Sequence, residues 1–169
     1  MNILSGNFKN YKIKTYKNFA YRPTKSRVRK SVFDRLQSFQ FNSVLDLFSG
    51  SGIIGFESAS RGAKSISFVE NDYKTLMLIK KNAESLIGPS YYYFQNDVFK
   101  FIKGCSQFDL IYADPPYGKY NIFQLAQDSF KKLKNQGKFF LECDKNQEPF
   151  MDCSFRDYGQ TRILYWEKK

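Results

Sequence analysis

The sequence contains no histidine among its 169 residues. This absence excludes Ser-His-Asp and Cys-His catalysis and argues against a zinc site, so no metal is expected. Cysteine is scarce, and Cys105, Cys143 and Cys153 lie far apart without a Cys-x-x-Cys pair. Isolated cysteines of this kind are typical of small, partly buried residues in a reducing compartment, which favours a cytoplasmic protein.

Long apolar runs are also missing. No segment reaches the length of a membrane span, and the first residues show no basic region followed by an apolar core. The sequence therefore predicts neither a membrane anchor nor a signal peptide. No repeat, low-complexity stretch or linker divides the chain, so residues 1–169 are expected to form a single domain.

Acidic residues are few, with 16 Asp and Glu against 27 Lys and Arg and a formal charge of +11. This excess favours an anionic partner, and nucleic acid is the first candidate; a solubilising surface is the alternative. Residues 9–35 hold ten of the basic residues, one acid and several interleaved aromatics. Residues 1–40 are therefore a predicted RNA-binding extension, with contacts expected from Lys9, Lys12, Arg22, Lys25, Arg27, Arg29 and Lys30.

Sequence patterns typical of strands and of helices alternate along the chain, which predicts a three-layer α/β/α fold with a mostly parallel sheet. A short β-hairpin is expected within residues 2–17, and an antiparallel C-terminal hairpin within 155–166. The predicted parallel strands are 43–48, 65–69, 91–95, 108–113 and 138–142. One helix is expected to follow the glycine-rich stretch 50–55 and to end near Arg61. Three further helices are expected over about 72–86, 98–103 and 122–133.

One further helix is expected ahead of the first central strand, capped by Thr24 or Ser26 and running to about Ser38. Its apolar residues recur at helical spacing and would face the core. Arg27, Lys30 and Arg35 would lie elsewhere on this helix, where they could meet phosphates.

The motif Asp114-Pro115-Pro116-Tyr117 follows a buried strand pattern, at the position where open α/β sheets place their ligand sites. Two prolines stop both strand and helix there and remove two backbone donors. The resulting loop offers a carboxylate, carbonyl groups and an aromatic face, which together suit a planar base that carries an amino group. The alternative is a Pro-Pro turn with a helix-capping Asp and a surface Tyr.

Gly50-Ser51-Gly52-Ile53-Ile54-Gly55 fits the G-x-G-x-x-G pattern, which nicotinamide and S-adenosylmethionine sites share. Asp46 lies just before this loop, where a carboxylate would repel a pyrophosphate but attract an ammonium and a sulfonium. Glu70 is placed for ribose hydroxyls and Asp97 for an adenine amino group. Alternatively, Asp97 caps a helix and Asp46 holds a loop. The favoured cofactor is S-adenosylmethionine, with contacts expected from Thr24, Asp46, Phe48, Ser49, Gly50, Gly52, Glu70, Asn71, Asn96, Asp97, Val98 and Asp114.

These residues resemble a known family over nearly the whole chain. The markers are Ile3–Gly6, Arg22-Pro23-Thr24 with Arg27-Val28-Arg29, Leu45–Gly52, Ser60–Ala63, Phe68–Glu70 and Asp114–Tyr117. Together they resemble the bacterial 16S rRNA guanine-N2-methyltransferases of the RsmD type, which are class I methyltransferases with a Rossmann-like fold. The family usually has an acid after Arg-Val-Arg, where this chain has Lys30.

The resemblance implies S-adenosylmethionine-dependent N2-methylation of a guanine in 16S rRNA, on an assembled or assembling 30S subunit. As a mechanism, the Asp114 carboxylate and the Pro115 carbonyl would accept hydrogen bonds from the exocyclic amine, and Tyr117 would stack on the flipped base. Pro116 completes the predicted catalytic loop. A monomer is expected, since no spare apolar stripe is evident.

Four alternatives stay open from the sequence. A DNA adenine-N6-methyltransferase uses the same motif, but the chain leaves no room for a DNA-reading segment. A protein-glutamine methyltransferase normally has Asn where Asp114 stands. A non-catalytic RNA-binding assembly factor would keep the fold, although the intact motifs argue against decay. A dehydrogenase would require a nicotinamide in the glycine loop.

Overall fold

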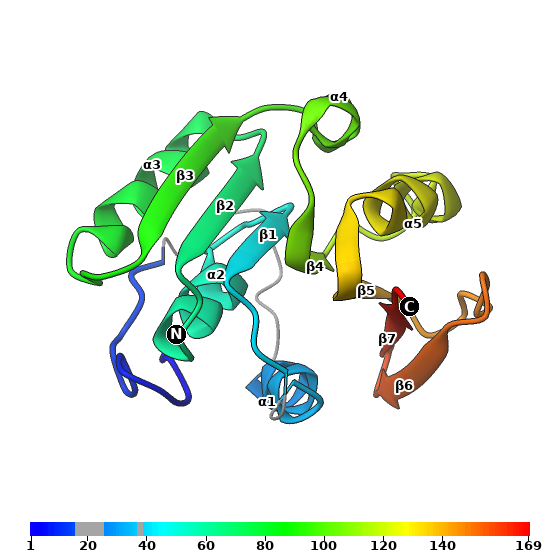
Figure 1. Ribbon diagram of the computed structural model, residues 1–169, viewed down its shortest axis with the longest axis horizontal. Helices are drawn as coiled ribbons and strands as arrows, with labels where there is room; N and C mark the ends of the chain where they lie inside the picture. Colours follow the sequence, from blue (N-terminus) through cyan, green and yellow to red (C-terminus); the bar gives the residue numbers. More distant parts are fainter. Residues whose placement is uncertain (16–25, 37–38) are drawn as a thin grey trace.

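The computed structural model describes residues 1–15, 26–36 and 39–169, and in this part of the chain seven strands form one sheet. They are β1 (Ser43–Leu47), β2 (Ser65–Glu70), β3 (Ser90–Gln95), β4 (Phe108–Ala113), β5 (Leu133–Asp144), β6 (Ser154–Tyr158) and β7 (Thr161–Glu167). Their order is β3-β2-β1-β4-β5-β7-β6 (Figure 1). The first five are parallel, and β7 pairs antiparallel with β5 and β6. The predicted Rossmann-like architecture is confirmed.

Helices cover both faces of the sheet. They are α1 (Ser26–Asp34), α2 (Ile53–Ser60), α3 (Tyr73–Ala83), α4 (Val98–Gly104) and α5 (Ile122–Lys131). Because side chains alternate along a strand, Val44 packs with α1, α2 and α3 while Leu45 packs with α4 and α5. Strands buried on both faces are mostly apolar, which explains why β1 and β4 are apolar apart from Ser43, Asp46 and Asp109. Within the described ranges, no helix is long and apolar enough to span a membrane.

The N-terminal segment packs onto α2 through a buried carboxylate. Glu57 accepts hydrogen bonds from the backbone N–H groups of Leu4 at 2.7 Å and Ser5 at 3.2 Å. The Glu57 carboxylate also forms an ion pair with Arg61, whose Nη2 lies 2.8 Å from Glu57 Oε1. Ile3 and Ile13 reach the core. The first fifteen residues are therefore part of the folded body.

Several predicted boundaries differ from the structure; α3, for example, ends at Ala83 and not near residue 86. The hairpin expected within 2–17 is shorter in the described residues: Asn2 and Lys12 form an antiparallel bridge, flanked by backbone hydrogen bonds from Ile3 to Tyr11 at 3.0 Å and from Ile13 to Met1 at 2.7 Å, and the Ser5 N–H is bound by Glu57 instead. Helix α1 ends at Asp34 instead of near Ser38. Strand β5 begins at Leu133, earlier than expected, because Leu133 pairs with Phe108 before a shift in register.

Candidate active site

The glycine loop joins β1 to α2 and depends on close packing. Gly50 and Gly52 have φ values of 52° and 73°, in the left-handed region that favours glycine. A Cβ on Gly55 would lie 2.3 Å from the ring of Phe68, on the neighbouring strand. Gly55 therefore allows α2 to approach the sheet, which is the role expected of the third glycine in this motif.

The side chain of Asp46, on β1, forms a hydrogen bond that stabilises this loop. It is almost fully buried, and its Oδ2 accepts a hydrogen bond from the backbone N–H of Gly55 at 3.0 Å. Burial raises the pKa of Asp46 to about 8, and the negative charge of Glu70 adds to the shift. The loop-holding role that the sequence offered as an alternative is thus the one seen in the structure. A contact between Asp46 and a cofactor stays a prediction.

Glu70 ends β2 and lies against the glycine loop. Its Oε2 accepts from the N–H of Gly50 at 3.0 Å, and its Oε1 accepts from the N–H of Asp72 at 3.0 Å. The neighbouring Asn71 is exposed, and Ser49 donates its hydroxyl hydrogen to the Asp46 carbonyl at 2.7 Å. Parallel strands thus bring the Glu70 carboxylate and the loop to one edge of the sheet, as the motif predicted.

Asp97 caps α4, since its Oδ1 accepts from the N–H of Lys100 at 3.0 Å. The capping alternative is therefore confirmed, while the second carboxylate oxygen has no hydrogen-bond partner among the described residues and is open to a ligand. Val98, next in the chain, is buried, whereas Asn96 is exposed and donates its N–H to the Glu70 carbonyl at 3.3 Å. These residues lie at the same sheet edge as Glu70.

An aromatic group borders this edge, and the sequence analysis named only one of its members, Phe48. The rings of Phe48 and Tyr120 lie 5.0 Å apart, and Tyr120 stacks on Phe99 at 5.9 Å. Phe48 has a φ of 56°, an uncommon backbone conformation for a bulky residue. The available signal was the place of these aromatic residues in the sequence, close to the predicted glycine, Asp97 and Asp114 loops.

The Asp114-Pro115-Pro116-Tyr117 loop lies beside the glycine loop because β4 and β1 are neighbours. The Asp114 N–H donates to the Leu47 carbonyl at 3.4 Å. Pro115 is buried and Pro116 is exposed. Asp114 itself is partly exposed, so its carboxylate sits at the surface end of the strand. The predicted catalytic loop and the predicted cofactor loop therefore leave the sheet from neighbouring strands, at the same edge.

Tyr117 is held by residues from the other half of the sheet. Its phenol oxygen lies 3.4 Å from Glu142 Oε1 and 3.1 Å from the Thr161 hydroxyl. Glu142 Oε2 also accepts from the Tyr112 hydroxyl at 2.9 Å. Burial, followed by the charge of Glu142, raises the pKa of Tyr112, so this phenol stays protonated as a donor. Tyr117 is a fixed ring and not a loose surface side chain.

Glu142 is the residue that sequence reasoning missed. It is buried near the C-terminal end of β5, although a carboxylate is rarely buried without partners. The available signal was its position, because it ends the expected strand 138–142 just as Glu70 follows the expected strand 65–69.

The predicted RNA contacts divide into three groups. Lys9, Lys12, Arg27 and Lys30 are exposed. Arg22 and Lys25, like the predicted cofactor residue Thr24, lie outside the described residues. Arg29 is a correction, because it is 1% exposed and donates from Nη2 to the Asn2 carbonyl at 3.1 Å. The amphipathic turn of α1 directs Arg29 inward, where it anchors the N-terminal segment and cannot reach RNA.

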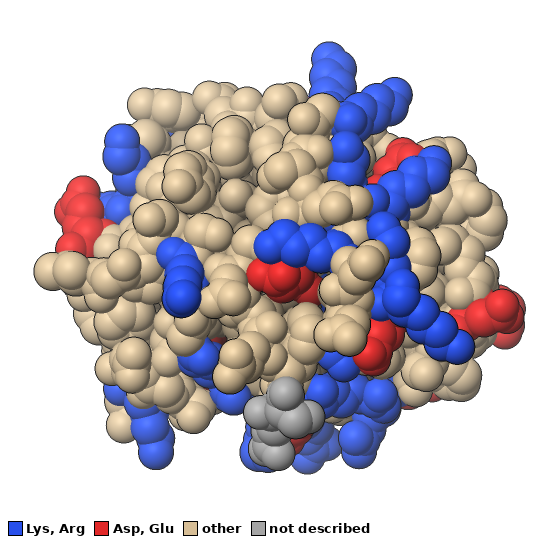
Figure 2. Space-filling view, viewed as in Figure 1, with Lys and Arg blue, Asp and Glu red and all other residues tan. Residues whose placement is uncertain are grey.

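Basic side chains gather along the lower edge of the face shown in Figure 2, where the N-terminal segment and α1 lie in Figure 1. Among the described residues, no cluster of His, Cys, Asp or Glu could hold a metal ion. The arrangement thus offers a carboxylate loop, a glycine loop and a basic flank.

Solved structures share the fold. The Escherichia coli chain yhhF superposes with a TM-score of 0.87 at 22% identity, covering 100% of this chain and 98% of that one. The Thermus thermophilus 16S rRNA N2 methyltransferase RsmC, whose structure holds AdoMet and guanosine, has a TM-score of 0.70 at 19% identity; 89% of this chain and 45% of that one are covered. The chain therefore has the fold of the class I methyltransferases.

The particular family follows from the sequence. Residues 1–167 match the family model described as conserved hypothetical protein 95. Ribosomal RNA small subunit methyltransferase D of Buchnera aphidicola is 31% identical over 151 residues, covering 86% of this chain and 78% of that protein. The chain belongs to this family, which is the RsmD type that its motifs resemble.

Proposed function

We propose that this protein transfers a methyl group from S-adenosylmethionine to the N2 amine of a guanine in 16S rRNA. The observation that carries the proposal is that the Asp114 loop and the glycine loop leave the sheet from neighbouring strands at the same edge, beside a Tyr117 ring held by Glu142. The family relatives named for small-subunit rRNA methylation support the substrate. We further propose that the enzyme acts as a monomer, without a metal, on the 30S subunit or its precursor in the cytoplasm.

The residues at the cofactor edge fit S-adenosylmethionine. The Glu70 carboxylate lies at the loop edge, where ribose hydroxyls could displace its present backbone donors, and the second oxygen of Asp97 is open to a donor. Left-handed Gly50 and Gly52 keep side chains away from the path of the ligand. The bound cofactor supplies an electrophilic methyl group on sulfur. Phe48, Ser49, Asn71, Asn96 and Val98 border the same edge.

The guanine amine is a weak nucleophile because its lone pair is delocalised into the ring. The Asp114 carboxylate and the Pro115 carbonyl would accept hydrogen bonds from this amine and favour a pyramidal nitrogen, and the Asp114 carboxylate would take the proton that the nitrogen loses on methylation. Pro115 and Pro116 lack N–H groups, so they present acceptors without competing donors. Positioning of the two reactants then supplies much of the rate.

Tyr117 contributes a stacking surface for the extruded base. Base–aromatic stacking is worth about 1–3 kcal/mol. Because Glu142 and Thr161 hold the phenol oxygen, the ring loses little rotational freedom when the base arrives. Residues 1–40, which include exposed Lys9, Lys12, Arg27 and Lys30, serve as the RNA-binding extension of a single domain.

The test is transfer of a labelled methyl group to 30S particles from cells that lack this gene, followed by nucleoside analysis. Free 16S rRNA and duplex DNA are run in parallel. We expect label in N2-methylguanosine, with particles preferred over free RNA. Label in N6-methyladenosine of DNA would assign the chain to the DNA enzymes instead. Cofactor binding without any transfer would support a non-catalytic assembly factor.

A further inference from the structure

A groove of about 560 Å³ lies between α1 and β6, two elements far apart in the sequence. Four positions of α1 border it, among them Arg27 and Lys30, and Arg35 follows directly after the helix, at the three- and four-residue spacing that defines one side of a helix. The opposite side of α1, which includes Val28 and Val32, packs into the core. The groove is therefore built on the solvent side of an amphipathic helix.

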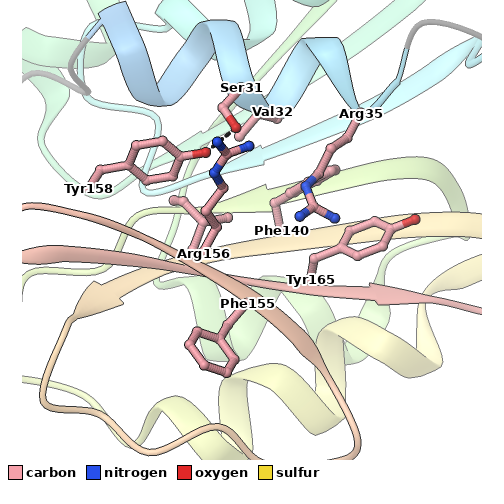
Figure 3. A pocket seen from close by; sticks show the side chains of 9 residues that line it. Ser31, Val32, Arg35, Phe140, Phe155, Arg156, Tyr158 and Tyr165 are labelled. Carbon is pink, nitrogen blue, oxygen red and sulfur yellow. Dashed lines mark hydrogen bonds between the residues drawn. The ribbon is translucent and has the colours of Figure 1, made fainter.

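Strand β6 supplies the second wall. Arg156, Asp157 and Tyr158 all border the groove, and Asp157 forms an ion pair with Arg162 on the neighbouring strand. Figure 3 shows the Arg156 side chain reaching from β6 toward α1, between Tyr158 and Arg35. The sequence analysis connected the α1 cations with phosphates, but it gave β6 no role.

The groove keeps an excess of positive charge after the side chains that form ion pairs are set aside. Its two acids are engaged, Asp34 with Lys30 at 2.7 Å and Asp157 with Arg162 at 2.7 Å. Within the described ranges, no carboxylate lies within ion-pair distance of Arg27, Arg35 or Arg156. The last two lie over aromatic rings, Arg35 over Tyr165 at 5.6 Å and Arg156 over Tyr158 at 5.7 Å. Three guanidinium groups thus remain available to an anion.

A series of contacts links the groove to the catalytic loop. The Tyr158 hydroxyl donates to the Ser31 hydroxyl, which fixes β6 against α1. Tyr158 pairs with Thr161 in the β6–β7 ladder, and the Thr161 hydroxyl lies 3.1 Å from the phenol oxygen of Tyr117. The basic groove therefore begins a few side chains from the proposed base-stacking ring.

We propose that the α1–β6 groove binds the phosphodiester backbone of the RNA strand that carries the target nucleotide. Guanidinium groups match phosphate oxygens with two parallel hydrogen bonds, which a lysine cannot do. Extrusion of a base requires the flanking backbone to be held, and the groove lies where that flank would run. This inference rests on the proposed RNA substrate and adds Arg156 and Tyr158 to its binding surface.

The experiment measures binding of unmethylated 30S particles, and of free 16S rRNA, by sedimentation across a range of KCl concentrations. The test variants are Arg156→Gln and the double Arg35→Gln/Arg156→Gln. The charge-matched control is Lys80→Gln/Lys81→Gln, on exposed positions of α3 beside β3, at the other end of the sheet. Thermal melting confirms that each variant is folded.

We expect the double variant to bind about tenfold more weakly at moderate salt, with the salt slope reduced by about 2, and the single variant to fall between. The control should keep the affinity and slope of the parent. Test variants that match the parent would overturn the groove assignment. Equal losses in the control would also overturn it, because they would reflect net charge alone.

The outcomes separate this inference from the proposed reaction. Groove-dependent binding with methylation of a different base would leave the groove in place and refute the N2-guanine product. Methylation at the proposed amine with groove variants unaffected would refute the groove alone. If the parent protein binds neither particles nor free RNA, both assignments are wrong.

Discussion

Glu142 Oε1 lies 3.4 Å from the phenol oxygen of Tyr117, while its Oε2 accepts from Tyr112 at 2.9 Å. One buried carboxylate thus links the catalytic loop to both β4 and β5. The link makes the position of the Tyr117 ring a property of the sheet and not of the loop alone.

Replacing Glu142 by Gln tests this link. The amide keeps the shape of the side chain but has only one acceptor oxygen, so it cannot accept from both tyrosines. We expect kcat to fall about tenfold with little change in the Kd for S-adenosylmethionine, because the loop loses its orientation and not its chemistry. Titration calorimetry with the cofactor and steady-state transfer to 30S particles provide the two readouts. An unchanged kcat would show that Glu142 does not position the loop.

Two substitutions at Tyr117 separate the ring from its hydroxyl. Tyr117→Phe keeps the stacking surface and removes the hydrogen bonds to Glu142 and Thr161, so a loss of less than about tenfold in kcat/KM is expected. Tyr117→Ala removes the stacking surface as well, and should cost a further 10-fold or so. Cofactor affinity should match the parent in both. Equal kinetics for the Phe and Ala variants would exclude a stacking role.

Asp114→Ala addresses the chemical step. The substitution removes the proposed acceptor for the guanine amine, so kcat should fall by about 100-fold or more. Cofactor binding should be largely retained, because Glu70 and the glycine loop are untouched. Single-turnover transfer to 30S particles is the measurement. A variant that methylates at the parent rate would remove Asp114 from the mechanism.

Asp46 makes a pH-dependent contribution to stability. Burial raises its pKa from 3.8 to about 8, so the folded state holds the proton more tightly than the unfolded state. The stabilisation is then complete below pH 3.8 and is lost as the pH rises to about 8. Within this window the free energy of unfolding should fall by up to about 1.4 kcal/mol per pH unit from this group.

Asp46→Asn provides the check, since the amide oxygen can still accept from Gly55 while the proton equilibrium is gone. We expect the variant to gain stability relative to the parent as the pH rises, measured by urea unfolding between about pH 5 and pH 8. Parallel curves for the two proteins would mean that Asp46 titrates with an ordinary pKa.

Local sequence patterns determined most of the fold. Apolar runs and their spacing predicted the parallel strands, their alternation with helices, and the terminal hairpin. Because parallel strands end at one edge of the sheet, the same patterns predicted that Asp114, Glu70 and Asp97 would lie near one another. The glycine spacing predicted the loop whose third glycine, Gly55, packs against Phe68.

Only the tertiary structure decided which polar residues are buried and which pair across the sheet. Arg29 and Arg27 have the same chemistry and stand two residues apart, yet the turn of α1 buries one and exposes the other. The partner of Ser31 in the groove, Tyr158, is 127 residues away. Glu142 lies close to Tyr117 only because β5 pairs with β4. Contacts at such separation depend on sheet register and helix packing, which no local pattern in one sequence encodes.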